Sequence, residues 1–278
     1  METGKALRLR RIFSRGKAVI IPIDHALYSG PMGGIEDLEK LVSIISKTPV
    51  DAILVTPAML TRVKNVIGNL ATVVRIDGTH TRLGSHLERI HLVTSVEHAL
   101  RVGADVVVIN VFVGTENEDE LLRKLGNVAT DCFKWGLPLM AEMIPSYILK
   151  HHYAQEGKNF DRERAADEIK LASRLGAELG ADIIKTPHTG SARSLKEVVS
   201  TTPVPIVIAG GPKTRGDKDF FQFVKEAIQA GAKGICMGRN VWQRKNIKGM
   251  LCALCHIVHE NAKVQEAMKE LNSKARTS

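Results

Sequence analysis

Short apolar runs, many of them rich in β-branched residues, recur along the chain and alternate with longer stretches of mixed polarity. The runs are nearly continuously apolar, which is typical of parallel strands that are buried on both faces. The pattern predicts eight strands, at residues 18–24, 52–57, 72–78, 105–113, 138–144, 182–187, 205–211 and 234–240.

Between these runs, apolar residues recur at the spacing of amphipathic helices. The period is clearest in residues 162–179, where Ala165, Ile169 and Ala172 fall on one helical face. Three helical stretches end in Gly-Ala, at 103–104, 180–181 and 231–232, directly before a predicted strand, and glycine commonly follows a helix end. Helices are predicted at 35–46, 95–102, 118–135, 162–179, 195–200, 220–230 and 247–258.

Eight strand–helix units within about 250 residues predict an α/β protein with the (β/α)₈ or TIM barrel fold. The alternative is an open doubly wound sheet, which seldom uses eight such evenly spaced units. We expect a single barrel domain over residues 1–278. The basic segment 1–17 and a polar, helix-prone segment at about 260–278 are expected as extensions, the second as a surface or subunit-contact helix.

The composition of the 278 residues is ordinary for a globular protein, with 44% hydrophobic and 25% charged residues, so disorder and coiled coil are excluded. Aromatic residues make up only 4%, which predicts an aliphatic core. No apolar run approaches the roughly 18 residues that a membrane helix needs. The four cysteines are too few and too scattered for a disulfide framework. We therefore expect a cytoplasmic enzyme without a membrane partner.

The formal net charge is +9, and basic residues cluster at 5–17, 213–218 and 239–248. Such a charge suits nucleic acid or an anionic, phosphorylated small molecule. Aromatic residues on which bases could stack are not interleaved with the basic ones, so the small molecule is favoured over nucleic acid. A solvated basic surface would account for most of these side chains in either case.

The chemistry of such barrels lies at the carboxyl ends of the strands. Lys185 follows an apolar run there, and burial near other cations would depress the pKa of its amine. A neutral lysine amine is a nucleophile that forms a Schiff base with a carbonyl group. The alternatives are a lysine that points to solvent or pairs with a carboxylate.

Asp24 ends the first apolar run and could shuttle protons beside Lys185. It could instead cap a loop or hold Lys185 in its charged form. Other polar residues at the strand ends, among them Arg75, Asp77 and Glu142, receive no separate role from their positions, and His25 is expected to be structural.

Two glycine-containing turns follow the seventh and eighth runs, which is the usual phosphate position in these barrels. Glycine allows backbone N–H groups to approach an anion closely, and basic side chains add charge. The alternative is tight turns without a ligand. The candidate phosphate-binding residues are Gly210, Gly211, Lys213, Gly238 and Arg239.

The sequence Cys252-Ala253-Leu254-Cys255-His256, followed by His259, matches a haem-attachment pattern. It lies within one continuous helical stretch, however, and its members share one stripe, as residues facing a core would. We expect no metal and no cofactor.

Taken together, these residues resemble the archaeal-type class I fructose-bisphosphate aldolase family, also called the DhnA/LsrF family. It includes aminodideoxyheptulosonate synthases and a thiolase that acts on a phosphorylated signal. The resemblance implies that Lys185 forms the Schiff base, that Asp24 is an acid/base, and that the glycine turns with Arg239 hold phosphate. It also implies a large homo-oligomer, often a decamer. The residues that carry it are 9–13, 21–25 with 30–31, 180–186 with 189–190, 210–213 and 238–240.

The chain departs from the family where the run 138–144 ends, because Ile144 stands in place of the tyrosine that serves as general acid/base. His188 likewise stands where a tyrosine is usual. Met140, Glu142 and Ile144 share one face of a strand, so Ile144 would form an apolar wall if that face points inward. Tyr147 or His188 is the expected substitute acid/base.

The main functional hypothesis is a Schiff-base aldolase or transaldolase acting on a phosphorylated ketose or keto sugar. The absence of the tyrosine also suits a thiolase-like transfer of an acyl group from a phosphorylated diketone to coenzyme A. A third hypothesis is a non-catalytic binder of sugar phosphate or nucleic acid.

Overall fold

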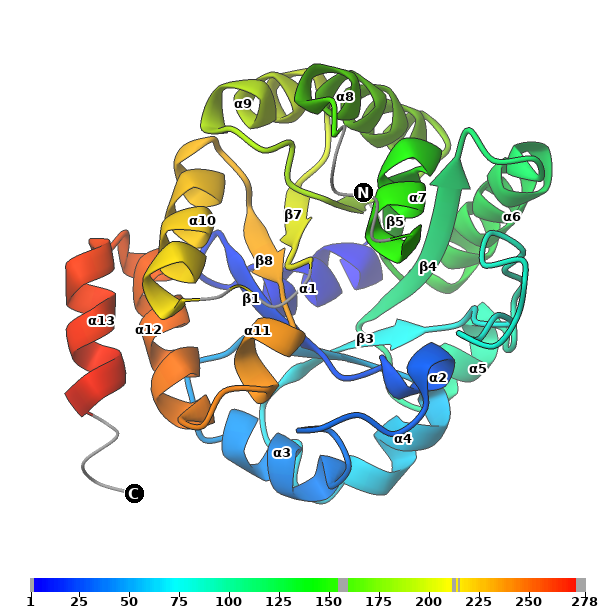
Figure 1. Ribbon diagram of the computed structural model, residues 1–278. Coiled ribbons are helices and arrows are strands. Elements are labelled where there is room, and N and C mark those ends of the chain that lie inside the picture. The colour runs from blue at the N-terminus through cyan, green and yellow to red at the C-terminus, as the bar shows by residue number, and fades with distance from the viewer. Residues whose placement is uncertain (1–2, 155–159, 212–213, 215, 274–278) are drawn as a thin grey trace.

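Eight strands form a closed ring in the computed structural model of the chain, which describes residues 3–154, 160–211, 214 and 216–273 (Figure 1). Each strand pairs in parallel with the next, and β8 pairs with β1, which confirms the predicted (β/α)₈ barrel. The strands are β1 (Ala18–Pro22), β2 (Ala52–Val55), β3 (Ala71–Arg75), β4 (Val106–Val113), β5 (Leu139–Pro145), β6 (Ile183–Thr186), β7 (Ile206–Ala209) and β8 (Gly234–Cys236).

Helices surround the strands (Figure 1), and every helix that the periodicity predicts is present. Their bounds are α1 (Thr3–Ile12), α2 (Ala26–Ser29), α3 (Leu38–Ile45), α4 (Pro57–Val63), α5 (Val96–Arg101), α6 (Glu118–Trp135), α7 (Ser146–Ala154), α8 (Arg162–Glu178), α9 (Ala192–Thr201), α10 (Asp217–Gln229), α11 (Arg239–Trp242), α12 (Ile247–Glu260) and α13 (Val264–Ser273).

The strands separate two apolar cores, which is why their sequences are apolar at nearly every position. In β1, for example, Ile20 packs inside the barrel while its neighbour Ile21 packs between the barrel and the helices. Both side chains are fully buried. Successive side chains of a strand point to opposite faces, so a strand covered on both faces needs apolar residues of either parity.

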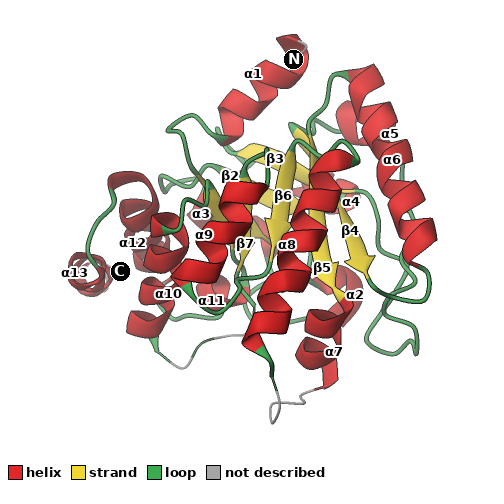
Figure 2. Ribbon diagram, turned by 90° about the horizontal axis from the view of Figure 1, so that it is seen from above, coloured by secondary structure: helices red, strands yellow, loops and turns green. Residues whose placement is uncertain are grey.

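Helix α1, which the periodicity did not predict, closes the end of the barrel at which the strands begin (Figure 2). Ile12 at its last position is fully buried and joins the core inside the barrel, with Leu9 and Phe13 packed beside it. The segment expected as an N-terminal extension therefore contains a helix that seals the barrel.

Three basic residues of this segment pair with aspartates at the starts of alternate strands. Each of these aspartates also accepts a hydrogen bond from a backbone N–H of the preceding strand segment, at 2.7–2.9 Å for the residue pairs Val19–Asp51, Thr72–Asp105 and Leu139–Asp182. Charges that could have contacted nucleic acid are thus used within the fold. The ion pairs are Lys5–Asp182 at 2.9 Å, Arg11–Asp105 at 2.8 Å and Arg15–Asp51 at 2.8 Å.

At the other end of the chain, α13 packs against α12 and α10 on the outside of the barrel (Figure 1). A C-terminal helix is therefore present among the described residues, and it begins at Val264 because α12 continues to Glu260. Within the described residues, no helix combines the length and the apolar character that crossing a membrane requires.

Candidate active site

A cavity of about 90 Å³ opens at the carboxyl ends of the strands. Polar side chains form its floor, and aromatic and aliphatic side chains form its walls. Lys185 and Asp24 both line it, so the fold brings together the two residues expected to share a site. The lining residues are Asp24, His25, Leu27, Tyr28, Arg75, Gly78, His80, Ile90, Asn110, Phe112, Glu142, Ile144 and Lys185.

Lys185 lies on β6 and is only 5% exposed. Its register partner on β5 is Glu142, and the Glu142 Oε1 atom lies 2.8 Å from the Lys185 Nζ atom. Of the alternatives open for this lysine, pairing with a carboxylate is the one that the structure shows.

The pKa of Lys185 is raised, so the expectation of a depressed pKa is wrong. Burial lowers this pKa, but Cys236 and Glu142 raise it by more. Burial also raises the pKa of the Cys236 thiol to about 12, so that group is neutral near pH 7. The Glu142 carboxylate is therefore the neighbour that keeps the resting amine protonated.

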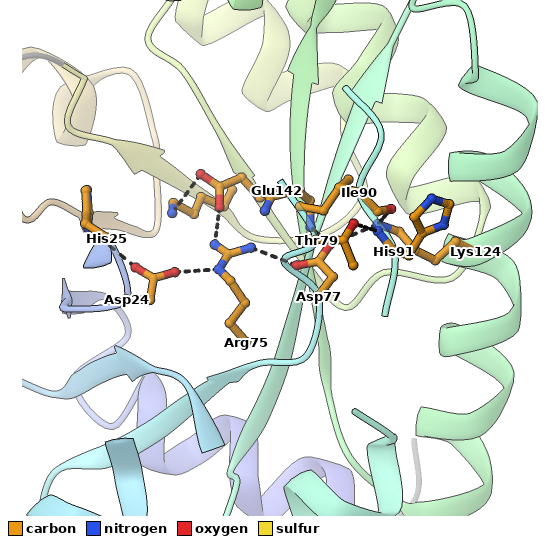
Figure 3. A network of polar contacts seen from close by, with 11 residues as sticks. Asp24, His25, Arg75, Asp77, Thr79, Ile90, His91, Lys124 and Glu142 are labelled. Carbon is orange, nitrogen blue, oxygen red and sulfur yellow. Dashed lines mark hydrogen bonds and ion pairs between the residues drawn. The ribbon is translucent and has the colours of Figure 1, made fainter. Parts of the chain in front are cut away.

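Arg75, near the end of β3, lies at the centre of the cavity floor and pairs with three carboxylates (Figure 3). Its Nε atom is 2.5 Å from Asp24 Oδ2, and its Nη2 atom is 2.5 Å from Glu142 Oε2. Its Nη1 atom is 3.2 Å from Asp77 Oδ1. One guanidinium group thus fixes the positions of the carboxylates that flank Lys185.

The two carboxylates nearest Lys185 are held in their charged forms. Burial would raise the pKa of Asp24, but Arg75, with His25 and Lys185, lowers it well below its usual value. Burial would likewise raise the pKa of Glu142, and Lys185 and Arg75 lower it. Both groups are therefore anions near neutral pH and accept hydrogen bonds rather than donate them.

A third cation completes the floor from outside the barrel. Lys124 of α6 reaches Asp77 with an Nζ–Oδ2 distance of 2.9 Å, and it donates a second hydrogen bond to the Ile90 carbonyl oxygen (Figure 3). Asp77 also accepts a hydrogen bond from the backbone N–H of Asn110. The network joins three carboxylates, Asp24, Asp77 and Glu142, to three cations, Arg75, Lys124 and Lys185.

Ile144 lies two residues beyond Glu142 on β5 and also lines the cavity, so the shared face of this strand points inward. Met140, with the same parity, packs deeper inside the barrel. Phe112 of β4 is the register partner of Ile144 and lines the cavity beside it. The position of the missing tyrosine is therefore an apolar wall, as predicted.

The structure places Tyr147 away from this cavity. Strand β5 ends at Pro145 and α7 begins at Ser146, which turns Tyr147 toward α8. Its hydroxyl oxygen accepts a hydrogen bond of 2.6 Å from the backbone N–H of Asp161, and its ring stacks against the Arg164 guanidinium. Tyr147 therefore packs helices together and does not face Lys185.

His188 also lies elsewhere, two residues beyond the end of β6. Its ring packs on Phe223 of α10 at 4.6 Å between centroids, and its Nδ1 atom accepts a hydrogen bond from the Gly190 N–H. It borders a separate hollow that Asp219 also lines. The expectation that Tyr147 or His188 replaces the tyrosine at the cavity does not agree with these positions.

The two glycine turns lie side by side after β7 and β8. The Arg239 Nη2 atom donates to the Gly211 carbonyl oxygen at 3.0 Å, and the Asn240 Nδ2 atom donates to that of Gly210 at 3.3 Å. A side chain at Gly210 or Gly238 would collide with neighbouring atoms, and Gly211 has a φ of 59°. Lys213 lies outside the described residues.

Within the described part of these turns, the Arg239 Nε atom is buried and makes no hydrogen bond. A donor left without a partner in a glycine-rich turn suits an anionic ligand.

The cysteine residues of α12 are buried, and its histidine residues pair with carboxylates. Cys252 and Cys255 are buried, which agrees with the core-facing interpretation of their stripe. His256 pairs with Glu270 of α13. The His259 Nε2 atom lies 3.0 Å from Asp51 Oδ2, at the opposite end of the barrel from the cavity.

Residues 18–244 match the DeoC/LacD family of aldolases. An uncharacterized aldolase of Saccharolobus solfataricus is 33% identical, over 96% of this chain and 99% of the relative. A 2-amino-3,7-dideoxy-D-threo-hept-6-ulosonate synthase of Halobacterium salinarum is also 33% identical, over 96% of each chain. A solved Schiff-base-forming fructose-1,6-bisphosphate aldolase superposes with a TM-score of 0.80, at 29% identity over 91% of this chain and 99% of that one. The chain belongs to the DeoC/LacD family of aldolases, enzymes that make or break carbon–carbon bonds.

Proposed function

We propose that this protein is a class I aldolase in which Lys185 forms a Schiff base with a phosphorylated ketose or keto sugar. The observation that carries the proposal is the buried Lys185 amine at the carboxyl end of the barrel, 2.8 Å from the Glu142 carboxylate. A glycine-rich turn lies two strands away, where phosphate binds in such barrels, and its Arg239 Nε atom has no hydrogen-bond partner in the described part of the chain. The structural relative named for Schiff-base chemistry supports the same assignment.

The first step is the activation of the amine. Lys185 rests as an ammonium ion, and it becomes a nucleophile when Glu142 takes one of its protons as the substrate enters. The Nζ atom then attacks the keto carbon to give a carbinolamine. Asp24, a carboxylate held by Arg75, relays the proton that leaves the nitrogen to the former carbonyl oxygen, which becomes a hydroxyl group. Glu142 then returns its proton to this hydroxyl group, and loss of water gives the cationic iminium.

The second step uses the iminium as an electron sink. The bond between the carbon next to the iminium carbon and the hydroxyl-bearing carbon beyond it breaks, and its electron pair moves toward the iminium to give an enamine. The carbon that leaves departs as an aldehyde, and hydrolysis of the reprotonated iminium releases the ketone and free Lys185. The same residues run the reaction in the direction of bond formation.

The phosphate group of the substrate is assigned to the turns after β7 and β8. Backbone N–H groups at Gly211 and Gly238 approach it, and Arg239 supplies charge through the Nε atom that has no partner among the described residues. Gly210 allows the close packing of the two turns, and Lys213, which the sequence suggests for the same role, lies outside the described residues.

Reductive trapping tests the proposal. Incubation with dihydroxyacetone phosphate and borohydride should add one adduct mass per chain, and omission of the ketone should abolish the gain. Lys185→Arg keeps the positive charge beside Glu142 but cannot form the Schiff base, so it should show no gain. A complete absence of adduct in the unaltered protein, with this and other phosphorylated ketones, would refute the proposal.

The second candidate function is thiolase-like acyl transfer to coenzyme A. The apolar Ile144 favours it, because this reaction does not require a proton donor at that position. Turnover of a phosphorylated diketone that depends on coenzyme A would distinguish it from aldol cleavage. A nucleic-acid binder is less well supported, because Lys5, Arg11 and Arg15 are paired with barrel aspartates.

We also propose that the protein works in the cytoplasm as a homo-oligomer, with a decamer as the form that the family resemblance implies. Exposed apolar side chains on the outer helices, Phe133 at 63% and Leu171 at 60%, support a contact between copies. Light scattering after size-exclusion chromatography tests the assembly, and a monomer at micromolar concentration would contradict it.

A further inference from the structure

Aldol cleavage needs a base that the floor of the cavity supplies poorly. The hydroxyl proton on the departing carbon must be removed as the carbon–carbon bond breaks. Asp24 and Glu142 are each held by Arg75 at 2.5 Å and are already assigned to the proton transfers at Lys185. Ile144 offers only hydrocarbon. The base is therefore sought among the titratable groups of the cavity wall, of which His25 already faces Asp24, with 3.5 Å between its Nδ1 atom and the carboxylate.

His80 is a titratable side chain in that wall. It follows β3 and is 8% exposed. Its ring stacks on Tyr28 with 5.8 Å between centroids, and it meets Phe112 edge-on at 6.3 Å. Phe112 is the register partner of Ile144. His80 and Ile144 thus both line the cavity, and Phe112 on the intervening strand contacts the first and is the register partner of the second.

The surroundings of His80 favour a neutral imidazole near pH 7. Burial lowers its pKa below the usual 6.5, and the charges of Arg75 and Lys124 add to this, while Asp77 opposes it. Tyr28 contributes a ring face and Phe112 a ring edge. Within the described residues, the Nδ1 atom is buried and has no hydrogen-bond partner, so this nitrogen is not engaged by another protein group.

We propose that His80 is the general acid/base of carbon–carbon cleavage in this protein, an inference that rests on the proposed Schiff base at Lys185. An imidazole nitrogen takes the proton from the hydroxyl group on the carbon two bonds from the iminium carbon. That hydroxyl becomes the aldehyde carbonyl as the carbon–carbon bond breaks, and the electron pair forms the enamine. The imidazolium then returns the proton to the enamine carbon, which restores the iminium for hydrolysis.

The test separates this step from Schiff-base formation by using dihydroxyacetone phosphate alone in D₂O. When the iminium forms the enamine and the enamine is protonated again, a carbon-bound proton of this ketone is exchanged for deuterium. NMR follows this exchange without a second substrate. Borohydride trapping on the same samples reports the Schiff base. The variants are His80→Gln, which keeps a polar side chain, and His80→Phe, which keeps the ring packing on Tyr28 and Phe112.

A matched control lies in the same loop. His91 is exposed and its side chain does not line the cavity, so His91→Gln removes an imidazole without touching the site. We expect His80→Gln and His80→Phe to lose deuterium exchange by about 100-fold or more, while trapping stays within about twofold of the unaltered protein. In the unaltered protein, the exchange rate should fall at low pH as the imidazole becomes protonated, and this fall should be absent in His80→Gln. His91→Gln should match the unaltered protein in every measurement.

Three results would overturn the inference. Exchange that survives both His80 variants shows another base, and its loss in Tyr28→Phe alone would assign that role to Tyr28. Exchange and trapping lost together in both variants show that His80 supports the site rather than moves the proton. Trapping without any deuterium exchange in the unaltered protein would show that no proton transfer occurs at the enamine carbon. Failure of trapping in the unaltered protein is a different outcome, because it refutes the Schiff base on which the inference depends.

Discussion

Glu142 lies beside Lys185 on the neighbouring strand, and its two carboxylate oxygens serve two cations: Oε1 lies 2.8 Å from Lys185 Nζ, and Oε2 lies 2.5 Å from Arg75 Nη2. The carboxylate is held by the guanidinium while it holds the proton on the lysine. This arrangement makes a charged, positioned amine the resting state, and it places the acceptor for the amine's proton within hydrogen-bond distance.

Replacement of this carboxylate should shift the ionisation of the lysine. In Glu142→Gln, the raised pKa of Lys185 should fall, because the opposing negative charge is lost while Arg75 remains nearby. The pH at which the rate of ketone trapping reaches half its maximum should move downward by about one unit or more, which is about 1.4 kcal/mol. Trapping rates measured from pH 6 to pH 10 check this, and an unchanged or higher midpoint would contradict the assigned role of Glu142.

Acid should weaken the fold through Asp24. Its pKa is lower in the folded protein than its ordinary value of 3.8, so its ionisation stabilises the fold above about pH 4, and that stabilisation is lost as the pH falls. Between pH 5 and pH 2, the unaltered protein should lose about 2 kcal/mol more of its free energy of unfolding than the Asp24→Asn variant does. Urea unfolding across this range measures the difference, and parallel curves would argue against the coupling between Asp24 and Arg75.

The closure of the barrel by α1 should contribute strongly to stability. Ile12→Ala empties a fully buried position in the interior core and should cost about 2–5 kcal/mol. Leu7→Ala on the same helix is the control, since Leu7 is 55% exposed and its replacement should cost about 0.5 kcal/mol or less. Urea unfolding compares the two. If both substitutions cost equally little, α1 does not contribute to the stability of the barrel.

A tyrosine introduced at the apolar wall should supply the family's missing acid/base. Ile144→Tyr should raise fructose bisphosphate cleavage about tenfold or more, and it should restore activity in the His80→Gln background, because a positioned acid/base contributes about 10²–10⁴-fold. Steady-state kcat/KM measures both effects. Lower activity in both backgrounds would show that the wall serves another purpose.

The two residues that lie away from the cavity should matter little for proton transfer. Tyr147→Phe and His188→Ala should leave kcat/KM within about threefold, since neither side chain lines the cavity with Lys185. Robust cleavage by the unaltered protein that is lost in either variant would place the acid/base at that residue instead.

Periodicity predicted the barrel because each strand must be apolar on both faces and each helix on one. The same logic placed Asp24 and Lys185 at one end of the barrel, and it predicted that Met140, Glu142 and Ile144 share one face, although not which way that face points. Helix α1 was missed because it alternates basic and apolar residues, and its apolar face is narrow.

Other features depend on contacts that no local pattern records. The direction of Tyr147 follows from the immediate start of α7 after β5. The charge state of Lys185 depends on Glu142, which is distant in sequence, and Lys124 reaches the floor from a helix outside the barrel. The strand-end positions of Arg75 and Glu142 were visible in the sequence, but their roles became clear only when their partners were known.

The most direct test of the account is the location of the reduced adduct. After borohydride treatment with dihydroxyacetone phosphate, proteolysis and mass spectrometry should find the added mass on Lys185. Lys124, a second buried lysine of the same network, provides the internal comparison and should remain unmodified. An adduct on Lys124 or another lysine, with Lys185 unmodified, would contradict the assignment of Lys185 as the Schiff-base residue.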